Sequence, residues 1–378
     1  MSWIKVAAIN LFVLLALLGA VLMAPPAVYY AYSAIKGISS SSADPRTEDS
    51  RASLEVYTGY DWAAEHFIEF SQLDTTYHDF IVWRRDDFDG NTININNGIR
   101  DTLISRSSNN MALRYWFFGG STTWGDGVPD DLTYPSIFAQ KTGAQVSNFG
   151  ETGYISRQNL DYLVSVISDP DRQSSLQGTH IVFYDGVNDV AQKCRSDNDG
   201  FSTSREEQIR KSLKKTYIER RSERYGFLST FSQVADLLNA VGRRMNLAPE
   251  LAADVDYSCS TSPDIARNVA ESLVNTWEVA AKIASSSGGQ FTAILQPVAF
   301  IGNPEIGYLD IDSKRPGLRA QYEAVYPIIR EIANERDFTF YDFSSVYNEC
   351  DNCYIDFCHV GPQAHHILVD ELETVIVR

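Results

Sequence analysis

A serine that follows two glycines, Ser121, stands where a catalytic nucleophile could act. Residues 113–118 before it are apolar and predict a buried strand, which ends abruptly at Gly119 and Gly120. Glycines at such a turn let the backbone approach a substrate closely and leave amide N–H groups to point at it. The same pattern also fits an ordinary polar turn after a core strand, so the residues that could assist Ser121 must decide between the two interpretations.

Residues later in the chain could supply this assistance. His359 can be the base that activates the serine hydroxyl, and Asp356, three residues earlier, can accept the Nδ1 proton and leave Nε2 facing Ser121. The negative oxygen of a tetrahedral intermediate needs donors, and the candidates are the backbone amides of Ser121 and Gly150 and the side-chain amide of Asn188. These residues predict a Ser-His-Asp triad with an oxyanion hole.

The segments around Ser121, Gly150, Asn188 and Asp356/His359 occur in that order, and together they resemble the four sequence blocks of the SGNH (GDSL-like) hydrolase superfamily. The serine block reads Gly-Gly-Ser-Thr instead of Gly-Asp-Ser-Leu, which leaves the nucleophile in place. The resemblance extends from about residue 113 to the C-terminus. It implies a serine hydrolase with a three-layer α/β/α, flavodoxin-like fold. An α/β-hydrolase is disfavoured because no Gly-x-Ser-x-Gly elbow occurs at Ser121.

Apolar strands alternate with helical stretches from residue 113 onward. The predicted strands cover residues 113–118, 145–149, 180–184, 291–295 and 338–343. The predicted helices cover residues 156–167, 263–285, 318–335 and 362–377. This alternation indicates a central parallel sheet covered by helices on both faces, with the active residues at the carboxyl ends of the strands.

The N-terminal region predicts a membrane anchor. Residues 6–23 are apolar apart from Asn10, and about 20 such residues span a bilayer. A cleaved signal peptide is the alternative, but no Ala-x-Ala site follows the apolar run, which favours an uncleaved helix within residues 1–35. Residues 36–50, with four consecutive serines, predict a flexible linker. Lys5 and the amino terminus favour a cytoplasmic N-terminus, so we expect the catalytic domain in the periplasm or outside a bacterial cell.

Two further segments surround the predicted catalytic domain. Residues 51–112 are rich in aromatics and contain predicted strands at 80–83 and 91–95; we expect this segment to pack on the catalytic domain. Aromatic side chains can stack on sugars, but a core role is the more common one. Residues 190–262 interrupt the strand–helix alternation and predict a helical insertion beside the active site. Its interleaved basic and acidic residues fit either a partner-binding arm or a solvated helix face.

Three cysteines, Cys350, Cys353 and Cys358, surround the Asp356/His359 loop. In an exported domain, a disulfide between two of them would hold this loop, and Cys194 with Cys259 could close the insertion; the sequence alone does not determine either pairing. The three cysteines and His359 could also be drawn as a zinc site, but the triad already uses His359. We therefore predict no metal site. Core or surface roles are expected for the remaining histidines: His66, His78, His180, His365 and His366.

The formal net charge of −17 argues against nucleic acid as a partner, because nucleic acid rewards a basic face. The function expected is that of a membrane-anchored serine esterase that needs no cofactor. Its substrate would be an acylated small molecule or glycan, with a polysaccharide or other glycan favoured and acetyl as the favoured acyl group. This substrate class comes from the superfamily resemblance. Two alternatives remain open: a glycan O-acyltransferase with the same nucleophile, and a non-catalytic glycan-binding or export component.

Overall fold

The computed structural model describes residues 49–102, 113–169, 176–196 and 256–377. Before residue 113, the elements are η1 (Ser50–Ser53), η2 (Glu55–Tyr57), α2 (Ala63–Ser71), β1 (Thr75–His78), β2 (Val82–Arg85), β3 (Phe88–Asp89), β4 (Asn94–Asn96) and β5 (Ile99–Arg100). The next group is β6 (Arg114–Gly119), α3 (Ser121–Trp124), η3 (Asp130–Leu132), α4 (Tyr134–Thr142), β7 (Gln145–Asn148), α5 (Ser156–Ser168), β8 (Thr179–Asp185) and α6 (Val187–Lys193). After residue 256 come α9 (Pro263–Ser286), β9 (Gln290–Leu295), α10 (Ile311–Lys314), α11 (Leu318–Asn334), β10 (Thr339–Asp342) and α12 (Pro362–Ile376).

The main sheet has the strand order β10-β9-β8-β6-β7-β5-β4-β3. Its first five members are parallel to one another. Counted along the chain from β6, their spatial order is that of flavodoxin-like, doubly wound sheets. The prediction of a central parallel sheet is confirmed for these strands. Parallel strands begin and end at the same edges, so the turns after β6, β7 and β8 gather at one edge of the sheet.

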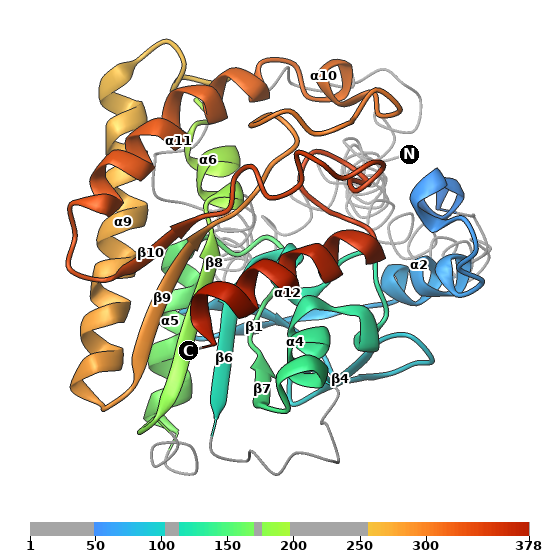
Figure 1. The fold of residues 1–378 in the computed structure, drawn as a ribbon, viewed down its shortest axis with the longest axis horizontal. Helices are drawn as coiled ribbons and strands as arrows, with labels where there is room; N and C mark the ends of the chain where they lie inside the picture. The colour runs from blue at the N-terminus through green and yellow to red at the C-terminus, as the bar shows by residue number, and fades with distance from the viewer. Residues whose placement is uncertain (1–48, 103–112, 170–175, 197–255, 378) are drawn as a thin grey trace, which may run out of the picture. The chain divides into compact units, whose positions relative to one another are not determined.

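Helices cover both faces of the sheet (Figure 1). α4 and α12 pack against each other on one face, while α5, α9 and α11 pack together on the opposite face. The strands between them are apolar because neither face reaches water; the fully buried side chains of β6 and β8 include Phe117, Phe118, Ile181, Val182 and Phe183. Each buried side chain of this size contributes about 1.5–3 kcal/mol of transfer free energy. The sheet is therefore a rigid base for the turns at its edge.

The segment before residue 113 joins the same sheet. β5 pairs with β7 in antiparallel orientation, with Arg100 opposite Asn148, and β4 and β3 extend the sheet outward. β1 and β2 form a separate antiparallel hairpin. The strands β3, β4 and β5 and the parallel strands thus share one sheet.

Two strand predictions in this segment were wrong in position. Only the second half of residues 80–83 is strand: residues 80 and 81 lie in a turn, and β2 starts at Val82. Phe80 and Val82 have φ of 66° and 81°, which extended backbone does not adopt. Residues 91–95 form a strand only at their end, where β4 begins at Asn94. The cause is the Glu69 carboxylate, which accepts the backbone N–H groups of residues 91–93 and so removes them from a β-ladder.

The predicted membrane helix, most of the linker and the central part of the insertion lie outside the described residues. The linker's last residue, Ser50, already begins η1. In the part of the chain that the structure describes, no helix is long and apolar enough to cross a membrane. At the base of the insertion, α6 continues to Lys193, and a disulfide joins Cys194 to Cys259.

Candidate active site

Ser121 is the first residue of α3, directly after β6 and the two glycines. The turn requires glycine: a Cβ at Gly119 would lie 2.6 Å from the backbone oxygen of Tyr184 on the neighbouring strand, and a Cβ at Gly120 would collide with the amide of Asn188. Ser121 is 5% exposed. Its N–H is the first of α3 and has no acceptor within the helix. The turn therefore places a hydroxyl and a backbone donor together at the carboxyl edge of the sheet.

His359 and Asp356 come from a narrow loop before α12. The loop is closed by a bridge between Tyr354 and Val360 and by a hydrogen bond from the Ile355 N–H to the His359 carbonyl. Asp356 Oδ1 accepts the backbone N–H groups of Cys358 and His359, each at 2.8 Å. These bonds hold the carboxylate in the loop, so that its second oxygen is free to face the imidazole.

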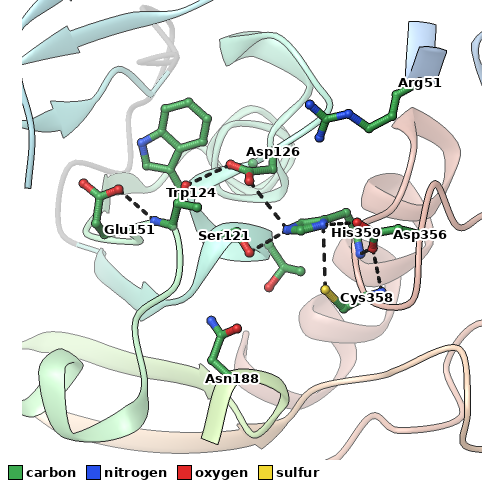
Figure 2. Close-up of polar contacts among 12 residues, drawn as sticks. Arg51, Ser121, Trp124, Asp126, Glu151, Asn188, Asp356, Cys358 and His359 are labelled. Carbon is green, nitrogen blue, oxygen red and sulfur yellow. Dashed lines mark hydrogen bonds and ion pairs between the residues drawn. The ribbon is translucent and has the colours of Figure 1, made fainter. Parts of the chain in front are cut away.

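The structure brings the three predicted triad residues together (Figure 2). His359 Nδ1 lies 2.7 Å from Asp356 Oδ2, and His359 Nε2 lies 2.6 Å from Ser121 Oγ. The tautomer that suits both contacts donates Nδ1–H to Asp356 and accepts the Ser121 O–H at Nε2. This arrangement can remove the serine proton during attack on a carbonyl carbon.

The pKa values of His359 and Asp356 are strongly shifted. Burial lowers the pKa of His359, but the Asp356 carboxylate at hydrogen-bonding distance outweighs it, and the pKa lies well above the ordinary value. For Asp356, burial acts to raise the pKa, but the imidazolium and the two backbone N–H groups hold it far below its usual range. Asp356 therefore stays ionised and can stabilise a positive charge on His359.

Asn188 lies beside the nucleophile turn, as its contact with Gly120 shows, and Figure 2 places its amide near Ser121. Nδ2 donates to the backbone oxygen of Tyr154 at 2.8 Å, which leaves its second N–H for another acceptor. The next residue, Asp189, is 1% exposed and holds α6 in place by accepting from Ser156 N and Oγ and pairing with Lys193 at 3.2 Å. Asn188 thus has a second side-chain N–H that could donate to an acceptor beside Ser121.

Gly150 is placed differently from the prediction. Its N–H donates to Asn148 Oδ1 at 3.0 Å, so this amide already has an acceptor. A Cβ at Gly150 would collide with the backbone of Thr123 and Trp124, so the glycine permits close packing of β7's exit turn on α3. The geometry therefore gives Gly150 a packing role and does not support it as an oxyanion donor.

Two residues at this site, Asp126 and Arg51, were not predicted from the sequence (Figure 2). Asp126 is 4% exposed, and its Oδ2 is 3.5 Å from His359 Nε2. Arg51, from η1, pairs with Asp49 at 2.7 Å and stacks over the Phe67 ring at 4.5 Å. Asp126 could have been found from its place five residues after Ser121, between two glycines. Arg51 has no such signal, because only the fold brings η1 to the site.

The cysteines divide into two disulfides and one thiol. Cys350 is bonded to Cys353, Cys194 to Cys259, and Cys358 is a buried free thiol whose pKa is raised to about 11, mainly by burial. A zinc site built on Cys350, Cys353, Cys358 and His359 is excluded because two of these sulfurs are joined to each other. The one trio of potential ligands among the described residues is Asp356, Cys358 and His359. Two of its members are already engaged in the triad's hydrogen bond.

The other described histidines lie away from the triad contacts. His66 Nδ1 contacts Thr92 Oγ1, His180 Nε2 contacts Thr292 Oγ1, and His365 Nδ1 accepts the N–H of Tyr134. Burial lowers the pKa of all three. These residues are neutral parts of the core or of its edges.

No protein-family model matches the chain, and no curated protein matches it. Several solved structures are similar to the chain. A carbohydrate acetylesterase family member from Sinorhizobium meliloti is 16% identical, with a TM-score of 0.35 over 70% of this chain and 97% of that one. A GDSL-like lipase from Bacteroides thetaiotaomicron is 12% identical, with a TM-score of 0.36 over 70% and 87%, respectively. An acetyl xylan esterase is 13% identical, with a TM-score of 0.36 over 70% and 99%. Likenesses of this size do not determine what this chain binds or does.

Proposed function

We propose that this protein is a serine esterase of the SGNH type that hydrolyses an acyl ester through Ser121, His359 and Asp356. The observation that carries the proposal is the continuous contact from Asp356 Oδ2 through the imidazole to Ser121 Oγ, at 2.7 Å and 2.6 Å. A purely structural or binding role for Ser121 needs no oriented base. A nucleophile does, because a serine hydroxyl is a weak nucleophile at neutral pH.

The reaction would proceed in two half-reactions. Ser121 Oγ bonds to the carbonyl carbon while its proton moves to His359 Nε2, and the same proton then passes to the leaving alcohol as the ester C–O bond breaks. Water then bonds to the acyl carbon while its proton moves to His359 Nε2, and that proton passes to Ser121 Oγ as the bond between the acyl carbon and Oγ breaks and the acid leaves. The Ser121 N–H and the Asn188 amide are the donors we propose for the oxyanion.

For the substrate, we propose an acetyl ester of a glycan. Support comes from the resemblance of the four sequence blocks to a superfamily with anchored members that act on acetylated polysaccharides. We further propose that residues 1–35 anchor the protein in the membrane with the catalytic domain outside the cytoplasm. The apolar run at residues 6–23 supports this proposal. Fractionation of cells after carbonate washing, with protease added to intact spheroplasts, tests both anchoring and orientation.

The test of the function is hydrolysis by the purified full chain. Phenyl acetate and phenyl butyrate measure esterase activity and acyl length, and acetylated xylan against its deacetylated form measures release of acetate from a glycan. Ser121→Ala is the inactive variant, and Ser286→Ala, which removes an exposed serine at the end of α9, is the matched control. Equal rates in wild type and Ser121→Ala would refute the proposal.

Hydrolysis is proposed over acyl transfer. A transferase must keep water from the acyl-serine while a sugar hydroxyl takes its place. The part of the connection from β9 to α11 around α10 is polar, and its residues Asp310, Asp312 and Lys314 are exposed. Free acetate and acetylated sugar, quantified after incubation with an acetyl donor and excess oligosaccharide, distinguish the two outcomes. Acetylated sugar as the main product would favour the transferase.

A further inference from the structure

Asp126 is carried by the same turn that presents Ser121. After α3 the chain reverses through Gly125 and Gly127, which both have φ of 97°, and the Asp126 N–H donates to the Ser121 carbonyl at 3.0 Å. A φ in this left-handed region favours glycine over other residues. The reversal folds the Asp126 side chain back toward the nucleophile. Its carboxylate therefore lies inside the site, where the residue is only 4% exposed.

The imidazole of His359 consequently lies between two carboxylates (Figure 2). Asp356 Oδ2 is 2.7 Å from Nδ1, and Asp126 Oδ2 is 3.5 Å from Nε2, the nitrogen that also contacts Ser121 Oγ. At 3.5 Å, Asp126 acts on Nε2 mainly through its charge and does not replace the shorter contact to Ser121. The proton-carrying side of the imidazole thus faces both the nucleophile and a negative group.

A chain of hydrogen bonds holds Asp126 in this orientation. Thr152 Oγ1 donates to Asp126 Oδ1 at 3.1 Å, and Arg85 Nη2 donates to the same Thr152 oxygen at 3.1 Å. The Arg85 N–H donates to Glu151, whose carboxylate lies 3.5 Å from the guanidinium. Because Oδ1 is occupied by Thr152, Oδ2 is the oxygen directed at His359. The anchor is β2, a strand of the segment that precedes the catalytic strands.

From this geometry we propose that Asp126 is a positioning residue for the base, a second carboxylate that stabilises the protonated form of His359 from its Nε2 side. The proposal rests on the proposed function. Asp126 takes no proton: the Ser121 proton moves to Nε2 as the Oγ–carbon bond forms, and it moves on to the leaving alkoxide as the ester C–O bond breaks. Asp126 lowers the free energy of the states in which Nε2 carries that proton.

Several other groups also face His359. Asp356 and Cys358 belong to its own loop, and Cys358 Sγ is 3.7 Å from Nδ1. Arg51 approaches from η1 as a positive group near both carboxylates, and it is paired with Asp49. The Tyr57 hydroxyl donates to the Gly127 carbonyl and stays neutral, because burial raises its pKa. Among these groups, Asp126 is the charge whose distance to Nε2 is short.

A carboxylate beside a base has two opposite effects on rate. It stabilises the imidazolium of the free enzyme, so the neutral base appears only at higher pH; it also stabilises the imidazolium of the transition state. Removing the charge should therefore move the acid limb of kcat/KM to lower pH, by about 1–3 pH units, the usual effect of an opposite charge within about 6 Å. At pH values above the acid limbs of both proteins, kcat/KM of the variant should be lower than that of wild type, by up to about tenfold for each pH unit that the limb moves.

The experiment compares wild type with Asp126→Asn, which keeps an oxygen for Thr152 and removes the charge. kcat/KM for phenyl acetate is measured from about pH 5 to pH 10. Asp131→Asn, on the exposed η3, removes the same charge from the protein and is expected to follow the wild-type profile. Asp126→Glu restores a carboxylate and should return the limb toward that of wild type. If circular dichroism shows Asp126→Asn to be unfolded, Asp126→Ser takes its place.

Profiles that cross, with the neutral variant faster at low pH and slower at high pH, are the expected result; a structural defect would lower the rate at every pH. An acid limb of Asp126→Asn that coincides with those of wild type and Asp131→Asn would overturn the proposal. The pKa of His359 from NMR titration, assigned with His359→Gln, decides without turnover. If the wild type does not hydrolyse the esters, or if Ser121→Ala hydrolyses them equally well, the proposed function fails. The NMR titration still tests the role of Asp126 in that case, because an unchanged pKa of His359 in Asp126→Asn refutes it.

Discussion

The two disulfides offer a prediction in which stability and activity separate. One variant replaces Cys194 and Cys259 with alanine, and the other replaces Cys350 and Cys353. All four cysteines are buried, with at most 2% exposure, so the loss of packing is similar in the two variants. The loops that the bonds close are very different, with sequence separations of 65 and 3.

The magnitude follows from loop closure. In the chain-entropy model, a cross-link over 65 residues stabilises the folded state by about 4.3 kcal/mol and one over 3 residues by about 1.6 kcal/mol. The Cys194/Cys259 variant should therefore unfold with a free energy about 2.7 kcal/mol lower than that of the Cys350/Cys353 variant. Guanidinium unfolding followed by circular dichroism measures the difference.

Activity should follow the opposite order. The Cys353 carbonyl accepts the N–H of Gly361, so Cys353 lies at the base of the loop that carries Asp356 and His359. Loss of this disulfide loosens the triad's geometry, and kcat for phenyl acetate should fall about tenfold, because small displacements of catalytic groups are costly. The Cys194/Cys259 variant should keep kcat close to wild type under folding conditions. Equal losses of stability in both variants, or a larger loss of kcat in the Cys194/Cys259 variant, would refute this reasoning.

Three further predictions concern the triad and its donors. Ser121→Ala and His359→Ala should each abolish hydrolysis, and the double variant should lose little more, because triad members act as a unit; additive losses in steady-state kinetics would contradict a shared step. Asn188→Ala should lower kcat by roughly 10²- to 10³-fold as one oxyanion donor is lost. Gly150→Ala forces a Cβ against α3 and should mainly lower the melting temperature. A normal melting temperature for Gly150→Ala would show that the turn can adapt. Because Asp356 outweighs burial and raises the pKa of His359, and because the base must be neutral, kcat/KM should rise with pH through a midpoint above the ordinary histidine value of 6.5. A midpoint below that value would show that burial dominates.

Much of the fold could be predicted because parallel strands buried on both faces are continuous apolar runs. β6, β8 and β9 are such runs, and each was predicted to within two residues at either end. The short strands β3, β4 and β5 could not be predicted in this way, because two or three residues show no period. They pair with one another, and β5 joins them to the main sheet through β7, which lies more than forty residues later.

Candidate site residues could likewise be predicted where the signal is local in the sequence, and not where it depends on the fold. Ser121, Asp356 and His359 could be predicted because their chemistry and local spacing are visible in the sequence. The acceptor of the Gly150 N–H could not, because the bond to Asn148 depends on a turn conformation that the residue types do not fix. The contact between Asp126 and His359 joins two loops that meet only in the folded sheet.

The distance along the chain between nucleophile and base has a consequence for biosynthesis. Ser121 and His359 are 238 positions apart, and Asn188 also precedes the base by most of the catalytic domain. A growing polypeptide therefore carries Ser121 for 238 residues, and Asn188 for the last 171 of them, before His359 is added. Under the proposed function, such a nascent chain has no base to activate Ser121 until the loop before α12 folds. α12 follows the His359 loop directly and packs on α4, so under the proposed function the base reaches Ser121 only with the last helix that the structure describes.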